Sequence, residues 1–158
     1  MVTPLDVCLA EGVALDIRDA RALAHRLLDA DAALSPADTG ASAIASLSVE
    51  LLPDWYDDWV LVEGEEWRQL RLHALESLAE RLLVERRFGD AMGAALAAVR
   101  TEPLRETARA VVIRVHLAEG NQSEALRAFA AYRAVLQAEL GLEPTAKLVG
   151  LVGDLLRE

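Results

Sequence analysis

The chain has 158 residues, which is enough for one domain with a substantial core. Hydrophobic residues make up 53% of it and there are only nine Gly and five Pro, which excludes a disordered chain. The formal net charge of −10 argues against nucleic-acid binding by this chain alone, because phosphate binding needs clustered Lys and Arg.

The cellular compartment is indicated by what the sequence lacks. No apolar run approaches the roughly 18 residues that a membrane span needs, and the Met1 region lacks the pattern of a signal peptide. The single Cys8 cannot form an internal disulfide, and we expect it to be a buried apolar thiol rather than a nucleophile. We therefore expect a cytoplasmic protein without a membrane segment.

The first third of the chain contains three segments with different sequence patterns. Alternating apolar and polar residues at 6–9 and 13–16 predict a short β-hairpin. An apolar stripe predicts a first helix over 16–33. The small, polar run 34–48 contains Gly, Ser and Pro and predicts a loop with one short helix from Ala41.

Residues 50–67, ELLPDWYDDWVLVEGEEW, are the most distinctive run. They hold all three Trp residues among seven acidic side chains and no basic one. We expect Asp54 and Asp57 to cap a helical turn that carries Trp55 and Trp59. These Trp residues form either a partner-binding surface or a plug on the open end of a helical stack.

The remainder of the chain predicts a long helix and two helical hairpins. The expected helices are 63–85, 88–102, 104–119, 121–140 and 145–156. Gly120 is the turn of the second hairpin, and Asn121 with Glu124 forms a cap pair for the helix that follows. Gly141 is expected to end that helix in a left-handed conformation, and Thr145 to cap the last helix.

Matching residues in the two hairpins recur at a fixed interval. The pairs that stand 34 residues apart are Ala91 and Ala125, Ala94 and Ala128, Ala97 and Ala131, and Glu85 and Glu119. This is the tetratricopeptide period, in which one helix-turn-helix unit buries its apolar face by stacking on the next. We therefore predict an all-α, tetratricopeptide-like right-handed stack of helical hairpins with about six or seven helices. The short β-hairpin-like remnant precedes it.

Two further patterns each have two interpretations. The motifs His73-x-x-Glu76 and His116-x-x-Glu119 suggest either a carboxylate-bridged metal site or ordinary pairing on a helix surface. We favour pairing, because a helical metal site needs further Glu residues from facing helices. The Arg-rich helices form either a basic face or a salt-bridged one, and the interleaved Glu residues favour salt bridges. The Arg residues concerned are Arg81, Arg86, Arg87, Arg100, Arg105, Arg109 and Arg114.

Three blocks of the sequence resemble a known family. They are LLPDWYDDWV at 51–60, RLHALE at 71–76, and the series PLRE…HLAEGN…EAL…Y…L…ELGLEPT over 103–145. Together they resemble the bacterial transcriptional activator domain of the Streptomyces antibiotic regulatory proteins. The resemblance covers the chain from about Val7 to its C-terminus and implies an all-helical domain without catalytic residues.

The resemblance also implies what this domain does. In the family it usually follows a winged-helix DNA-binding domain, and it is associated with dimerisation and with recruitment of RNA polymerase. Residues 1–17 resemble only the closing strands of a winged helix, and 18–158 match the activator domain. We therefore expect a truncated form, the product of a decayed gene or a standalone form, in each case without autonomous DNA binding.

The leading hypothesis is a transcriptional regulator module that activates secondary-metabolite genes through protein contacts. Its expected partners are RNA polymerase, a full-length activator of the same family or a second copy of the chain. The candidate partner surface comprises Trp55, Trp59, Trp67, Arg105 and Arg109. The alternative is a tetratricopeptide-like scaffold that binds a peptide or small ligand and has no role in transcription. An enzyme is a distant third, and no cofactor or metal is expected.

Overall fold

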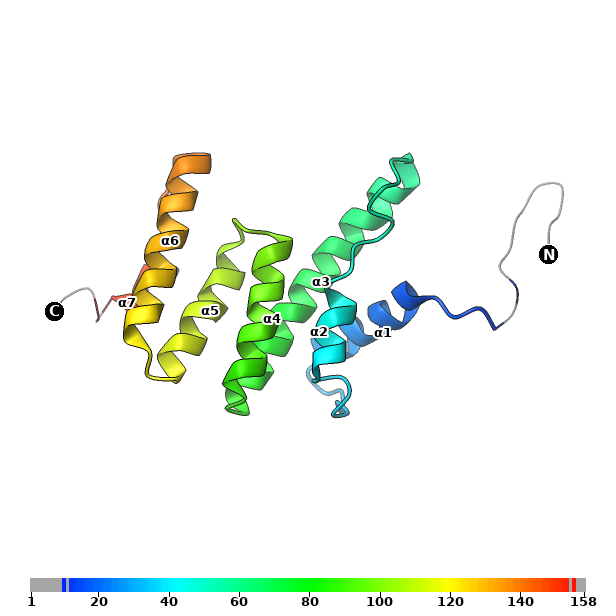
Figure 1. The fold of residues 1–158 in the computed structure, drawn as a ribbon, viewed down its shortest axis with the longest axis horizontal. Helices are drawn as coiled ribbons and strands as arrows, with labels where there is room; N and C mark the ends of the chain where they lie inside the picture. Colours follow the sequence, from blue (N-terminus) through cyan, green and yellow to red (C-terminus); the bar gives the residue numbers. More distant parts are fainter. Residues whose placement is uncertain (1–9, 11, 154, 156–158) are drawn as a thin grey trace.

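A computed structural model describes residues 10, 12–153 and 155, and these residues form seven helices in a single row (Figure 1). The prediction of an all-helical, tetratricopeptide-like stack is confirmed. The helices are α1 (Asp16–Leu28), α2 (Ala41–Leu47), α3 (Asp58–Val84), α4 (Phe88–Thr101), α5 (Glu106–Ala118), α6 (Gln122–Leu140) and α7 (Ala146–Val152). Helices α1 and α2 lie at one end of the row, and α6 and α7 lie at the other (Figure 1).

Helix α1 ends at Leu28, five residues before the predicted end. Asp29 takes an extended conformation, and its carboxylate accepts a hydrogen bond of 3.0 Å from the backbone N–H of Asp31. A short Asp side chain that binds nearby backbone offers the chain an alternative to the helix. Helix α2 begins at Ala41 as predicted.

The 34-residue repeat of the sequence is also present in the positions of the helices. Shifted back by 34 residues, α5 coincides with 72–84, the second half of α3. The second half of α3 with α4 is therefore the first hairpin, and α5 with α6 is the second. Residues 58–71 are an extension of α3 that has no counterpart in α5. This extension begins five residues before the predicted start of the helix and projects beyond α4 (Figure 1).

The turns of the two hairpins have the same hydrogen bonds. Arg86 donates its backbone N–H to Leu83, and Gly120, 34 positions later, donates to Leu117, each over 3.0 Å. The backbone N–H of the next residue also donates to a carbonyl of the preceding helix. Arg87 donates to Leu82 over 2.9 Å, and Asn121 donates to His116 over 2.8 Å. Both central residues have positive φ, 62° for Arg86 and 81° for Gly120. The same backbone is thus built once with Gly and once with Arg.

Small side chains join α3 to α4. Four alanines of α4 are completely buried: Ala91, Ala94, Ala95 and Ala98. They pack in one cluster with the buried leucines of α3, which are Leu72, Leu75, Leu78 and Leu82. Because the distance between packed helices depends on the side chains at the contact, alanines bring the two helices close together.

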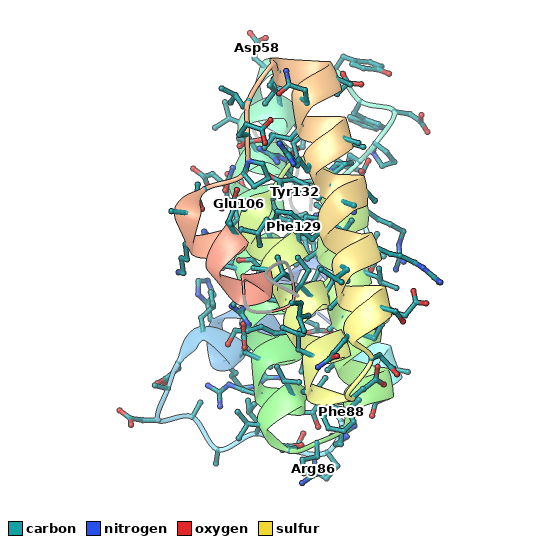
Figure 2. The ribbon with its side chains drawn as sticks, turned by 90° about the vertical axis from the view of Figure 1, so that its left-hand side faces the viewer. Asp58, Arg86, Phe88, Glu106, Phe129 and Tyr132 are labelled. Atoms are coloured by element: carbon teal, nitrogen blue, oxygen red, sulfur yellow. The ribbon has the colours of Figure 1, made fainter. Side chains whose placement is uncertain are left out.

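The second hairpin has a separate, smaller core. Phe129, Tyr132 and Leu136 of α6 pack with Ile113 of α5 and with Leu148 of α7. The Tyr132 hydroxyl donates to the carbonyl of Leu104 over 3.1 Å, so the buried phenol is satisfied. Figure 2 looks onto this end of the stack and labels Phe129 and Tyr132.

Helix α7 closes this end of the stack. Thr145 caps it as predicted, because its hydroxyl accepts from the backbone N–H of Leu148. Glu106, which lies in the first turn of α5 and is labelled in Figure 2, accepts hydrogen bonds from the backbone N–H and the hydroxyl of Thr145. Gly141, with φ of 67°, ends α6 in the left-handed conformation that the sequence predicts. A carboxylate at the start of α5 thereby fixes the start of α7.

Three local predictions are wrong. The second arm of the predicted β-hairpin is not a strand, because 13–15 has no regular structure and Asp16 begins α1. The first arm, which includes Cys8, lies outside the described residues. Asn121 and Glu124 do not form a cap pair, since the Asn121 amide donates instead to Glu119 over 3.1 Å. The last helix ends at Val152 rather than near 156.

The Arg-rich helices form a salt-bridged face. Arg105 binds Glu76 over 2.7 Å, and Arg114 binds Glu80, so two ion pairs join α5 to α3. Arg87 binds Asp90 over 2.8 Å at the start of α4. This interpretation of the charged helices is confirmed for these three Arg residues. Among the described residues, no helix is long and apolar enough to cross a membrane.

We predict that substitutions at the two equivalent turns change the free energy of unfolding in opposite directions. Gly120→Ala lowers the free energy of unfolding by about 1 kcal/mol, because a left-handed conformation costs a residue with a Cβ about 1–2 kcal/mol. Arg86→Gly raises it by about 0.5 kcal/mol, because relief of the same strain exceeds the entropy that Gly adds to the unfolded chain. Urea unfolding followed by circular dichroism measures both. Equal signs for the two variants would contradict the equivalence of the turns.

Candidate protein-interaction surface

The segment that joins α2 to α3 is bound to the α3 extension by two buried side chains. The Trp67 indole N–H donates to the carbonyl of Val49 over 2.8 Å. One helical turn later, the Arg71 guanidinium donates to the carbonyl of Ser48 over 3.0 Å and lies 3.5 Å from the Glu50 carboxylate. These contacts fix the backbone of 48–50 against α3.

Arg71 is a buried cation, with only 3% of its surface exposed. Burial lowers its pKa, and the Glu50 carboxylate opposes that effect. Because guanidinium does not lose its proton in proteins, the charge has to be compensated on the spot. The carbonyl of Ser48 and the carboxylate of Glu50 provide this compensation, so the course of the segment is coupled to the burial of Arg71.

Beyond Glu50 the chain presents aromatic side chains to solvent. The exposed fraction is 54% for Trp55, 78% for Tyr56 and 56% for Trp59. Leu52 has φ of 43°, a conformation that costs a residue other than Gly on the order of 1–3 kcal/mol. The Trp55 backbone N–H closes the resulting turn by donating to the carbonyl of Leu52 over 3.0 Å. We call Trp55, Tyr56 and Trp59 the aromatic surface.

Seven carboxylates belong to the same run of sequence as the aromatic surface, and four of them form no ion pair with a described residue. Glu50, Glu63 and Glu65 form ion pairs with Arg71, Arg21 and Arg68. The Arg68 guanidinium, with help from Gln69, lowers the pKa of Glu65 to about 2. The remaining acidic side chains form no ion pair with any described residue: Asp54, Asp57, Asp58 and Glu66. The surface is therefore both aromatic and negatively charged.

The helical turn predicted for 54–59 is not formed. Trp55 precedes α3, which begins only at Asp58, and the side chain of the N-cap residue Asp57 makes no capping hydrogen bond. Trp55 and Trp59 are consequently held by a turn and by the first turn of a helix, rather than by one continuous helix.

Trp67 was expected on the partner surface, and the structure corrects this. Its side chain is 1% exposed and belongs to the main core cluster. The sequence does contain the signal for this difference, because Val60, Trp67 and Ala74 are spaced by seven and share one buried face of α3. Trp59 lies one position off that face. The interpretation of the Trp residues as a core plug therefore holds for Trp67 but not for Trp55 or Trp59.

Arg105 and Arg109 are not brought together with the exposed Trp residues. Arg105 binds Glu76 and lies 3.2 Å from a ring nitrogen of His73. Arg109 donates twice to the carbonyl of Pro103, over 3.1 and 3.0 Å, and its guanidinium lies 5.7 Å from the Tyr132 ring centre. Burial lowers the pKa of Arg109. Both side chains already stabilise the stack.

The two His-x-x-Glu motifs form pairs within single helices. His73 lies 4.0 Å from Glu76, and His116 lies 3.8 Å from Glu119. In the described part of the chain, no group of three or more His, Cys, Asp or Glu side chains is arranged to hold a metal ion.

Comparison of the sequence with models of protein families identifies the family of this chain. The model of the bacterial transcriptional activator domain matches residues 14–156. The chain belongs to this family. A search of curated proteins finds no match. The family is one of transcriptional activator modules, so the exposed side chains of this chain are candidates for contact with a partner.

Sequence reasoning missed two residues of this activator domain. Tyr56 is the most exposed member of the aromatic surface, and the signal for it was its position between two Trp residues in an acidic run. Arg71 was missed because its principal partner is a backbone carbonyl 23 residues away, which leaves no mark in the sequence.

We predict that two matched substitutions separate the core Trp from the surface Trp in the activator domain. Trp67→Phe lowers the free energy of unfolding by about 2 kcal/mol, because it loses the bond to Val49 and leaves a cavity. Trp59→Phe changes it by less than about 0.5 kcal/mol, because the ring is solvated on one side. Chemical unfolding of the two variants beside the wild type provides the comparison. A loss for Trp59→Phe as large as that for Trp67→Phe would refute the assignment.

Proposed function

We propose that this activator domain acts by contacting RNA polymerase, or a full-length activator of the same family, through the aromatic surface. The exposure of Trp55, Tyr56 and Trp59 on a fixed backbone is the observation that carries the proposal. Trp and Tyr are the residue types most enriched at the energetic centres of protein interfaces. Large apolar side chains left in water are otherwise a liability for a folded chain.

The way the surface is supported strengthens the proposal. The contacts of Trp67 and Arg71 hold the segment before the aromatic surface, and Leu52 has a strained backbone in the turn that precedes Trp55. A surface that is rigid before binding loses less entropy when the partner arrives. Strained backbone persists where the surrounding structure imposes it, and such positions cluster at functional sites.

The proposal also covers the setting in which the domain works. The net charge of −10 supports a module that relies on another domain or protein for DNA binding. We propose a cytoplasmic regulator of secondary-metabolite genes that is able to pair with a second copy of itself or with a full-length relative. Light scattering over a range of concentrations distinguishes the self-paired form from a monomer.

The experiment is retention of purified RNA polymerase, or of a purified full-length activator, on the immobilised domain. We predict that Trp55→Ala/Trp59→Ala reduces retention at least about tenfold, since loss of one interface centre costs about 2 kcal/mol and 1.4 kcal/mol is tenfold in affinity. Val84→Ala is the matched control, because Val84 is 84% exposed and lies at the opposite end of the same helix.

Both variants are first shown to unfold at the wild-type temperature. Equal retention by the double variant and the wild type would remove the aromatic surface from the proposal. Failure of the wild type to retain either partner would contradict the proposal as a whole.

A further inference from the structure

A groove lies beside the aromatic surface, between the start of α1, the end of α2 and the segment 49–53. Its volume is about 650 Å³, within the range of sites that hold small ligands or a few side chains. The described residues that line it are Asp16, Ile17, Asp19, Ala20, Ala45, Ser46, Val49, Glu50, Leu51, Leu52, Pro53 and Trp67.

The lining of the groove is mostly apolar, and one wall is held rigidly. Ala20 and Trp67 belong to the main core cluster, and Ile17 and Leu51 pack against it. The bonds from Trp67 to Val49 and from Arg71 to Ser48 fix the start of the wall formed by 49–53. The groove is therefore a formed feature of the fold with apolar surface to offer a partner.

The charge in the groove has a single sign. Asp16 and Asp19 lie in the first turn of α1, and Glu50 lies on the opposite wall. Among the described residues that line the groove, no basic side chain accompanies these three carboxylates. Glu50 remains 66% exposed despite its contact with Arg71, so its carboxylate is still open to another cation.

We propose that this groove binds a basic amphipathic segment of another protein. Apolar side chains of the segment cover the Ile17, Ala20 and Leu51 surface, and its Lys or Arg residues pair with the three carboxylates. An amphipathic helix laid in an apolar groove is a common mode of recognition, and charges at the rim set its specificity. Acidic peptides and nucleic acid are repelled by the same carboxylates. A second copy of this chain, with its net charge of −10, is disfavoured for the same reason.

This site differs from the aromatic surface and does not require the proposed function to be correct. Leu52 and Pro53 line the groove, whereas Trp55, Tyr56 and Trp59 do not. The two surfaces adjoin through this short stretch, so one partner is able to use both. The test below uses purified components without polymerase, so its outcome is independent of the retention experiment.

The probe is a fluorescent peptide of about 14 residues, with Leu on one helical face and Lys on the other, and its anisotropy is followed as the intact chain is added. Two comparison peptides carry Glu in place of Lys, or Ser in place of Leu. We predict that each comparison peptide binds at least about tenfold more weakly, because the groove needs both the charge and the apolar face. Equal binding of the Ser peptide would show attraction to net charge alone and overturn the proposal.

Variants of the chain then locate the peptide. Ala45 is exposed on the groove wall, and Ala45→Phe fills the groove without disturbing the core. Asp16→Asn/Asp19→Asn removes two rim charges, and Glu124→Gln/Glu139→Gln on α6 changes the net charge equally as a control. We predict about a tenfold loss of affinity for the first two variants and little change for the control.

Three outcomes would overturn the groove as the binding site. Ala45→Phe would bind the Lys–Leu peptide as the wild type does. Trp55→Ala/Trp59→Ala, which leaves the groove lining intact, would abolish binding and so move the peptide to the aromatic surface. Deletion of residues 1–9 would tighten binding many-fold, which would identify the occupant as this chain's own beginning.

Discussion

The close packing of α3 against α4 is the interaction on which the rest of this activator domain depends. Fully buried alanines of α4, such as Ala94 and Ala98, allow the two helices to approach closely, and α5 packs against both α3 and α4. A single hairpin leaves apolar surface on both sides, so the stack needs closing elements. Helix α7 closes one end through Glu106 and Thr145, and α1 with α2 covers the other.

The repeat was predictable because close contacts restrict residue type. Where two helices approach at alanine distance, only small side chains fit, so Ala91 and Ala125 recur 34 positions apart. The turns are less restricted, since Arg86 adopts the conformation that Gly120 adopts more easily. The helix ends were predicted poorly where a polar side chain binds a nearby group instead of the expected one. Asp29 ends α1 early, and its carboxylate accepts from the backbone N–H of Asp31, whereas Asn121 binds Glu119 instead of capping α6.

The candidate site was predictable in composition but not in arrangement. The acidic Trp-rich run identified the region, yet burial of Trp67 and exposure of Trp59 follow from which face of α3 meets α1, α2 and the segment before α3. Arg105 and Arg109 were assigned to a partner although Glu76 and the Pro103 carbonyl already engage them. The groove could not be foreseen, because its walls come from α1, α2 and 49–53, and only the folded chain brings them together.

The aromatic surface, on the segment before α3 and on the first turn of α3, is a proposed contact surface separate from the stack that supports it. Amide hydrogen exchange of the domain, alone and saturated with RNA polymerase or with a full-length activator of the family, locates this contact surface. We predict added protection in 49–66 and unchanged exchange in α6. Protection confined to α6 and α7, or none in 49–66, would contradict it.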